Sequence, residues 1–220
     1  MTSLEAIAAQ LDAPDFGQRI QALIKLRAIE AADAVPLLAK ALKDPNPRVR
    51  YSAVSLLGQK RSPQTLALLQ EVLTTDPEFD VRAAAAAALG DLGDPLALDD
   101  LVEAYRVDQD EMVRFSAVAA LGELRDERAI ELLADAIQQG GLIETAAVMA
   151  LGQIPSVRTY DLLAPFAASE SWEMRFRVAQ ALKISSDERA IALLKQLQAD
   201  PHPQVAQEAT FSLVEKDLTP

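Results

Sequence analysis

The chain has 220 residues and a formal net charge of −12, and 50% of its residues are hydrophobic while only 5% are aromatic. Because a field of this sign repels phosphate backbones, we expect no nucleic acid partner. The lack of cysteine excludes disulfides, thiolate metal sites and a cysteine nucleophile. The sequence shows neither an apolar run long enough for a transmembrane helix nor a signal-like start, so we expect no membrane insertion and a cytoplasmic location.

An arginine-type position recurs along the chain every 30 to 32 residues. The series is Arg19, Arg50, Arg82, Arg114, Glu144, Arg175 and Ala206. Similar strings surround it, such as RVRYSAVSLLG at 48–58, DVRAAAAAALG at 80–90 and MVRFSAVAALG at 112–122. A period of this length is typical of repeat solenoids, in which each unit packs against its neighbours.

Each unit is predicted to hold two helices. The second helix opens at the arginine-type position, repeats an apolar face such as Val49, Ala53, Leu56 and Leu57, and ends near a glycine. Four residues beyond the glycine, or at the equivalent point of the sixth unit, stands a capping residue that starts the next first helix, in the series Ser62, Asp94, Asp126, Ser156 and Asp187. An Asp turn then follows, at Asp44, Asp76, Asp108 and Asp200. These signals predict an all-α fold, an α-solenoid of about seven antiparallel helix pairs.

The V-R-x-x-A-x-x-A-L-G pattern after an Asp turn resembles the HEAT-like repeats of the phycobilisome lyase type, from about residue 12 to residue 215. Narrower matches, DFGQRIQALIKLR at 15–27, RFSAVAALGELRDERAIELL at 114–133 and MRFRVAQAL at 174–182, resemble cyanobacterial proteins that dismantle the phycobilisome. In HEAT-like arrays the Asp and Arg of successive turns form a ladder of charge-assisted hydrogen bonds. The resemblance therefore implies that Asp44, Asp76 and Asp108, with Arg50, Arg82 and Arg114, are staples between repeats.

The chain is predicted to be a single HEAT-like array over residues 1–220, with a break near 139–144. There Gln138-Gln139-Gly140-Gly141 replaces the Asp turn, and Glu144 replaces the arginine. Glycine permits backbone conformations that other residues avoid, so the array bends or loosens at this point. The alternative is a shortened turn without functional meaning.

The second helix of each unit has a further face that the core does not need. At about 100° per residue, the first and fifth positions after the arginine point away from the core positions. These positions carry no charge, and we expect them to form an apolar trough that contains Tyr51, Ser55, Ala83, Ala87, Phe115, Ala119, Met149, Phe176 and Gln180, and continues to Gln207 and Phe211. Trp172 either closes one end of this trough, beside Arg177, or braces the sixth turn. Exposed apolar surface of this kind marks interaction sites, whereas the alternative is that these side chains are peripheral core.

No catalytic motif is visible in the chain, so no catalytic residue is predicted and no metal site is expected. The one histidine, His202, lies in a DPHP turn and is predicted to be solvated. Residue types and spacing alone favour a binding protein.

The resemblance implies a phycobiliprotein-binding factor that promotes phycobilisome degradation, with bilin lyase-like detachment of the chromophore as one form of that role. No cofactor is expected to be tightly bound, and phycocyanobilin is the implied transient ligand. Its rings would stack on Tyr51, Phe115 or Phe176, and its propionates would pair with Arg177 or an unpaired ladder arginine. The alternative is a non-enzymatic adaptor or scaffold that binds another protein client, so the question of enzymatic activity stays open.

Overall fold

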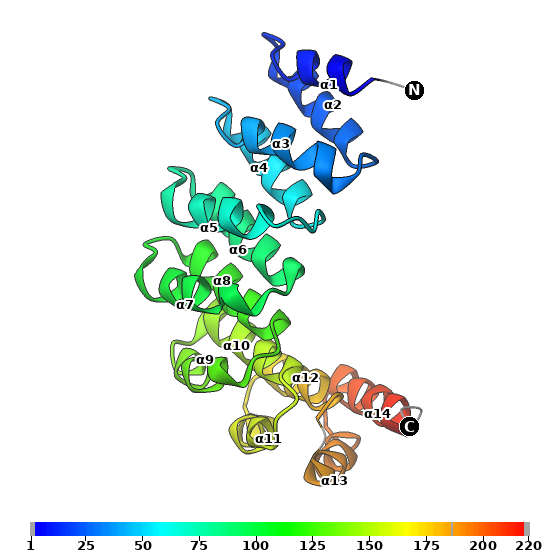
Figure 1. Ribbon diagram of the computed structural model, residues 1–220. Helices are drawn as coiled ribbons and strands as arrows, with labels where there is room; N and C mark the ends of the chain where they lie inside the picture. Colours follow the sequence, from blue (N-terminus) through cyan, green and yellow to red (C-terminus); the bar gives the residue numbers. More distant parts are fainter. Residues whose placement is uncertain (1–2, 186, 218–220) are drawn as a thin grey trace. The chain divides into compact units, whose positions relative to one another are not determined.

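The computed structural model describes residues 3–185 and 187–217, which form two compact units that meet in sequence between Ala120 and Leu121 (Figure 1). The first unit holds α1 (Leu4–Gln10), α2 (Phe16–Leu26), α3 (Ala31–Ala41), α4 (Pro47–Leu57), α5 (Thr65–Thr75), α6 (Phe79–Leu92), η1 (Pro95–Ala97), α7 (Leu98–Val107) and most of α8 (Glu111–Glu123). The second holds η2 (Glu127–Ala129), α9 (Ile130–Ile137), α10 (Gly141–Gln153), α11 (Val157–Leu163), η3 (Ala164–Ala168), α12 (Trp172–Leu182), α13 (Glu188–Leu197) and α14 (Pro203–Asp217).

These elements confirm the predicted fold class. The described residues contain fourteen α-helices, with three short 3-10 helices and no strand, and the α-helices follow one another as seven pairs. In the first unit the second helices α2, α4 and α6 contact one another in succession, and in the second unit α10, α12 and α14 do the same. Each unit is therefore a stack of helix pairs with a continuous row of second helices.

The predicted caps start the first helices of the pairs. The side chains of Asp94, Asp126, Ser156 and Asp187 each accept a hydrogen bond from the backbone N–H two residues further on. Ser62 accepts from the N–H of Gln64 in the same way, but α5 begins only at Thr65. These side chains satisfy backbone donors that a helix start would otherwise leave unpaired.

Glycines near the ends of second helices allow neighbouring backbones to approach closely. A Cβ added at Gly152 would lie 2.5 Å from both Cα and Cβ of Ala181 on the next second helix, and one added at Gly122 would lie 2.5 Å from the Cα of Ala150. α8 and α10 each continue one residue past these glycines. The glycines therefore serve packing between repeats as well as the helix ends that the sequence predicted.

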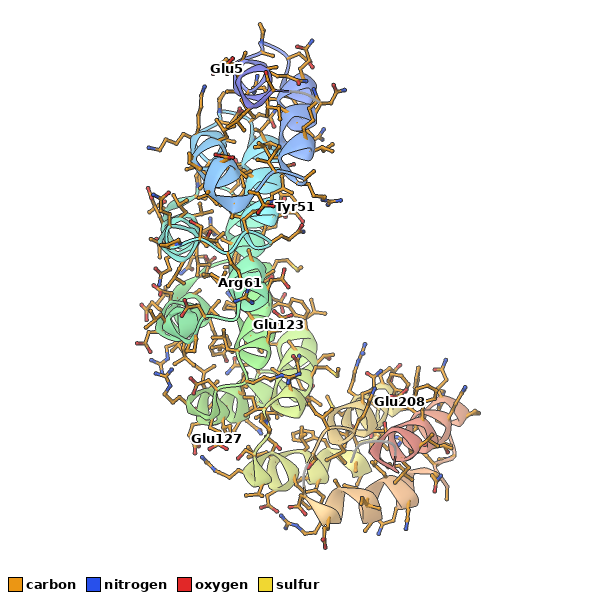
Figure 2. All side chains as sticks on the ribbon, turned by 45° about the vertical axis from the view of Figure 1, so that its right-hand side comes forward. Glu5, Tyr51, Arg61, Glu123, Glu127 and Glu208 are labelled. Carbon is orange, nitrogen blue, oxygen red and sulfur yellow. The ribbon has the colours of Figure 1, made fainter. Side chains whose placement is uncertain are left out.

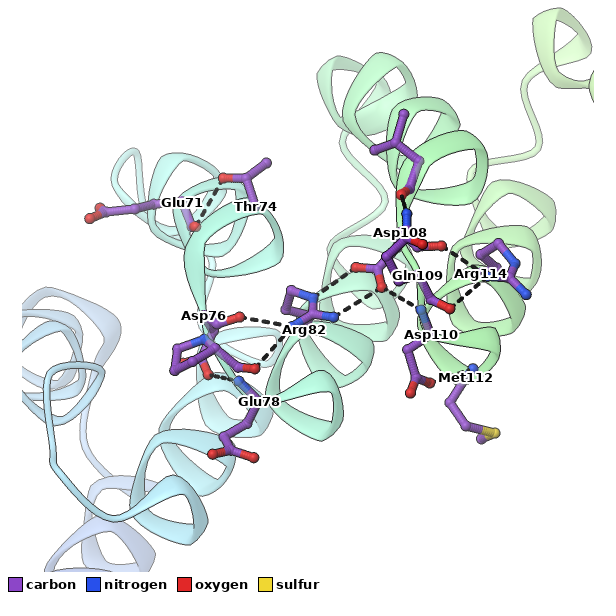
Figure 3. Close-up of polar contacts among 12 residues, drawn as sticks. Glu71, Thr74, Asp76, Glu78, Arg82, Asp108, Gln109, Asp110, Met112 and Arg114 are labelled. Carbon is purple, nitrogen blue, oxygen red and sulfur yellow. Dashed lines mark hydrogen bonds and ion pairs between the residues drawn. The ribbon is translucent and has the colours of Figure 1, made fainter.

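The Arg–Asp ladder is present in both units. The guanidinium of Arg50 donates from Nε to Asp76 at 2.7 Å and from NH2 to the same carboxylate at 2.9 Å, and both residues are buried. Equivalent two-bond pairs join Arg19 to Asp44, Arg82 to Asp108 and Arg175 to Asp200. Figure 3 shows the Arg82–Asp108 pair. Each arginine therefore staples its own turn to the aspartate of the next repeat.

Arg114 departs from this pattern, and its predicted role as a staple is wrong. Its hydrogen bonds within the described chain go to the carbonyl oxygens of Asp108 and Gln109. The residue that corresponds to the accepting aspartate in the next repeat is Gln138. The ladder is thus interrupted at the fifth repeat, where Gln138 replaces the aspartate and Glu144 replaces the arginine.

Residues 139–144, where a break is predicted, lie in the turn between α9 and α10 and in the first residues of α10. Gly140 and Gly141 have φ angles of +74° and +62°, a left-handed conformation that side chains other than glycine rarely adopt. The border between the two compact units lies earlier in the chain, inside α8. A bend at 139–144 stays a prediction.

The buried ladder predicts a loss of stability in acid. Burial raises the pKa of Asp76, but hydrogen bonds from Arg50 and from the N–H of Glu78 outweigh it and hold the pKa below its ordinary value. A carboxyl whose folded-state pKa is lowered stabilises the fold above its unfolded pKa and loses that contribution as the pH falls through the folded value. We expect Asp76→Asn to lower the free energy of unfolding by about 1–3 kcal/mol near neutral pH. The difference from the parent should shrink toward pH 3, as measured by urea denaturation across pH.

The control for this variant is Asp161→Asn, because Asp161 pairs with Arg189 in an exposed position. An exposed ion pair contributes about 1 kcal/mol or less, so this variant should stay close to the parent. A deficit of Asp76→Asn that is constant from neutral to acid pH would contradict the role of the ionised carboxylate.

Close packing of the second helices predicts that Gly152→Ala destabilises the protein by about 1–3 kcal/mol, since its Cβ would meet the Ala181 backbone. Gly17→Ala is the matched control, because its Cβ would meet only the side chain of Asp15, at 3.1 Å. Alanine is a better helix former than glycine by about 1 kcal/mol, so the control should be neutral or stabilised. Thermal and urea denaturation measure both variants, and equal stability of the two would refute the packing argument.

Candidate binding site

In the first unit the predicted trough residues lie on α4, α6 and α8. Tyr51 is 48% exposed, Ser55 and Ala87 are exposed, and Ala83, Phe115 and Ala119 are half-buried. Ile24 on α2 occupies the fifth position after its arginine, as Ser55 and Ala87 do on α4 and α6, and it is 63% exposed. Figure 2 labels Tyr51 on the second-helix row. This part of the trough is thus uncharged and accessible, and its role in binding stays a prediction.

In the second unit the predicted residues Met149, Trp172, Phe176, Arg177 and Gln180 are all half-buried. Three of them, Trp172, Phe176 and Arg177, come together in a hollow of about 380 Å3 formed by α12 and α14. The remaining lining residues are Glu173, Gln204, Gln207, Glu208 and Phe211. Met149 and Gln180 lie outside this lining. In this hollow, two aromatic residues that the sequence singled out, Trp172 and Phe176, lie together with the cationic side chain of Arg177.

A ladder rung positions the aromatic end of the hollow. Asp200, which receives the guanidinium of Arg175, also accepts a hydrogen bond from the backbone N–H of His202 at 2.8 Å. The imidazole of His202 stacks on the indole of Trp172, with ring centroids 3.9 Å apart and an angle of 9° between the planes. The orientation of Trp172 therefore follows from the contact between the sixth and seventh repeats.

The prediction that His202 is solvated is wrong. The residue is half-buried, and its Nδ1 atom is buried without a hydrogen-bond partner among the described residues. The stacking contact with Trp172 encloses the ring. A turn histidine looks solvated in sequence because the tryptophan that covers it comes from the preceding repeat.

Charged groups border the hollow on both helices. Arg177 donates from NH1 to Oε1 of Gln180 at 3.2 Å, and its guanidinium carbon lies 5.9 Å from the centroid of the Phe176 ring. Gln180 therefore contributes by orienting Arg177. Ser171 donates its hydroxyl to Glu173, which lowers the pKa of that carboxyl. Glu208, labelled in Figure 2, supplies a second carboxylate from α14.

The sequence pattern predicted some of the residues that line this hollow. Gln207 and Phe211 occupy the first and fifth positions after Ala206, so they belong to the predicted series. It missed Glu173, Gln204 and Glu208, which stand two residues before or after an arginine-type position. Those positions lie beside the fifth position on a helical wheel, and this relation is the signal that could have found them.

The lining offers aromatic faces and one guanidinium, that of Arg177, beside the carboxylates of Glu173 and Glu208. Aromatic rings offer faces for stacking, and a guanidinium forms charge-assisted hydrogen bonds with carboxylates. In residues 3–185 and 187–217, no group of three or more His, Asp or Glu side chains is arranged to hold a metal ion. Nor does any helix in these ranges combine the length and the apolar character needed to cross a membrane.

A family model described as HEAT repeats matches residues 4–90, 71–141 and 142–214. A comparison with curated proteins found no match. Among solved structures, the chain is similar to the complex of CpcE and CpcF of phycocyanin lyase from Nostoc sp. PCC7120, with a TM-score of 0.61 and 22% identity, over 97% of this chain and 94% of that chain.

Two further structures share the architecture. The Escherichia coli protein YIBA has a TM-score of 0.62 and 20% identity, over 98% of this chain and 83% of its own. A designed armadillo repeat protein in complex with a (KR)4 peptide has a TM-score of 0.50 and 20% identity, over 97% and 99%. At these identities the likeness concerns the fold.

The exposure of the trough predicts that replacing Tyr51, Phe115 and Phe176 together by alanine leaves a folded protein. None of the three lies in the core, so their loss should cost less than the about 3–5 kcal/mol per residue typical of buried aromatics. Circular dichroism melting should still show one cooperative transition. The control Leu151→Ala truncates a fully buried side chain and should cost about 2–5 kcal/mol. A triple variant that is insoluble would show that these residues are core.

Proposed function

The chain belongs to the HEAT-repeat family, and on this premise we propose that it is a phycobiliprotein-binding factor that promotes phycobilisome degradation by favouring removal of the bilin chromophore. The observation that carries the proposal is the hollow between α12 and α14, where Trp172, Phe176 and Phe211 meet Arg177. The fold shared with the CpcE and CpcF complex of phycocyanin lyase supports the choice of partner. The narrow sequence matches support a degradation factor of the NblB type.

The hollow offers complementary groups for an open-chain tetrapyrrole. Pyrrole rings would stack on the Trp172 and Phe176 side chains, and a propionate would pair with Arg177. The carboxylates of Glu173 and Glu208 would accept hydrogen bonds from pyrrole N–H groups. These residues would bind the bilin. None of them is assigned a role in cleaving the bond between the bilin and cysteine.

The trough of the first unit would supply the contact with the protein part of the partner. Tyr51, at the first position after Arg50 on α4, and Ile24, at the fifth position after Arg19 on α2, are exposed apolar side chains on neighbouring second helices. Because the chain carries a net charge of −12 and phycobiliproteins are themselves generally acidic, apolar contact has to overcome charge repulsion. Affinity should therefore change little or rise with salt, which screens that repulsion.

The same trough favours a second candidate function, a non-enzymatic adaptor for another protein client. An uncharged row on successive second helices fits an extended or helical polypeptide segment. The designed armadillo neighbour is in complex with a basic peptide, and the acidic charge of this chain would suit a basic client.

Mixing the purified protein with holo-phycocyanin tests the first proposal. We expect a complex in size-exclusion chromatography and a change in the visible absorbance of the bilin. Trp172→Ala combined with Phe176→Ala should weaken binding at least tenfold, since truncation of an aromatic hot spot costs about 2 kcal/mol or more. Leu96→Ala is the control, because it removes a 72% exposed apolar side chain outside the site.

Three outcomes separate the candidates. A complex whose absorbance stays that of free phycocyanin would support binding and contradict chromophore removal. No complex at tens of micromolar would refute the phycobiliprotein proposal. Capture of a basic client from cell extract, lost on Tyr51→Ala, would then support the adaptor.

A further inference from the structure

One side of the guanidinium group is bonded in the same way in every ladder arginine. These arginines are Arg19, Arg50, Arg82, Arg114 and Arg175. In each, NH1 donates to the carbonyl oxygen of the residue six positions earlier, at 2.7 to 3.0 Å. In four of them, Nε and NH2 then face a carboxylate of the next repeat and bind it with two parallel hydrogen bonds. The bonds to the carbonyl thus orient the fork toward an anion.

Arg114 keeps the orienting bonds and lacks the internal carboxylate. Its NH1 donates to the carbonyl oxygens of Asp108 at 2.9 Å and Gln109 at 3.1 Å, as Figure 3 shows. Within the described chain its Nε and NH2 donate to no carboxylate, although the residue is half-buried. Arg114 therefore presents two pre-oriented donors.

Nearby acidic groups do not satisfy these donors. Both carboxylate oxygens of Asp108 are engaged by Arg82, and one of them also accepts the N–H of Asp110. The corresponding position of the next repeat is Gln138, which carries no charge. A half-buried guanidinium with a fixed fork and no ion pair favours a carboxylate from outside the chain.

We propose that Arg114 is a carboxylate-binding residue that receives an acidic group of the protein's ligand in the two-bond geometry of the other ladder arginines. Carboxylate is favoured because four equivalent forks in this chain hold carboxylates. The proposal that the acidic group belongs to a phycobiliprotein, as a side chain or as a bilin propionate, rests on the proposed function. The orientation of the two Arg114 donors is independent of that function.

The first test is independent of any phycobiliprotein. The Nε–H resonances of Arg114 and Arg82 in 15N-labelled protein are assigned with Arg114→Gln and Arg82→Gln and followed during titration with glutarate. We expect a saturable shift of the Arg114 resonance at millimolar glutarate, as for a weak ion pair, while the Arg82 resonance stays fixed because its fork is filled. An Arg114 resonance that does not move, or that moves no more than that of Arg82, overturns the proposal.

The second test locates the carboxylate. Arg114→Gln should keep the melting temperature of the parent, because it strands no carboxylate, whereas Arg82→Gln should melt several degrees lower, because Asp108 loses its partner. Arg114→Gln should bind holo-phycocyanin about tenfold more weakly. An equal loss with the chromophore-free subunit assigns the carboxylate to a protein side chain, and a loss with the holo form alone assigns it to the bilin.

Failure of the two proposals can be told apart. If the parent binds phycocyanin and Arg114→Gln binds it equally well, Arg114 has no part in this contact and the inference is wrong, while the proposed function stands. If the parent binds no phycocyanin, the proposed function fails, and the glutarate titration still decides whether Arg114 binds carboxylates.

Discussion

At four places in the described chain, a single guanidinium ties one repeat to the next. One side of the group is bonded to the turn of its own repeat, and the other side grips the aspartate that opens the following turn. That aspartate also accepts the N–H two residues later and so shapes the approach to the next second helix, as Asp76 does with Glu78. The register of the helix pairs thus depends on a charge-assisted contact that is repeated along the chain.

With this register, the two faces of each second helix lie in different surroundings. One face of each second helix enters the core, and small residues such as Gly152 and Ala181 bring neighbouring second helices into backbone contact. The opposite face lies outside the core, and there Tyr51 is exposed while Phe115 and Phe176 are half-buried, at positions where solvent would favour charge. Apolar residues at such positions are typical of interaction sites, and ligand binding by this face stays a prediction.

The ladder also connects stability with the candidate site. The rung between Arg175 and Asp200 fixes the turn that contains His202, and His202 in turn stacks on Trp172 at the edge of the hollow. Where the rung is missing, at Arg114, the same kind of group is left with donors for an external partner. One residue type at one repeat position therefore acts as a staple where the next repeat supplies a carboxylate, and in our proposal it acts as a recognition group where the next repeat supplies none.

The sequence by itself determined the all-helical repeat fold, the helix pairs and the arginines of the ladder, because these follow from local signals: caps, apolar period and a recurring interval. It also pointed to Phe176, since its helical position opposes the core, and to Trp172 and Arg177, which stand near it in the sequence. Only the tertiary structure decided that these three meet Glu208 and Phe211 across α12 and α14, that His202 is enclosed by Trp172, and that Arg114 binds carbonyl oxygens and no carboxylate of the described residues. Each of these depends on distances between residues about 25 to 35 positions apart, which are set by the packing of one repeat on the next and which no local pattern encodes.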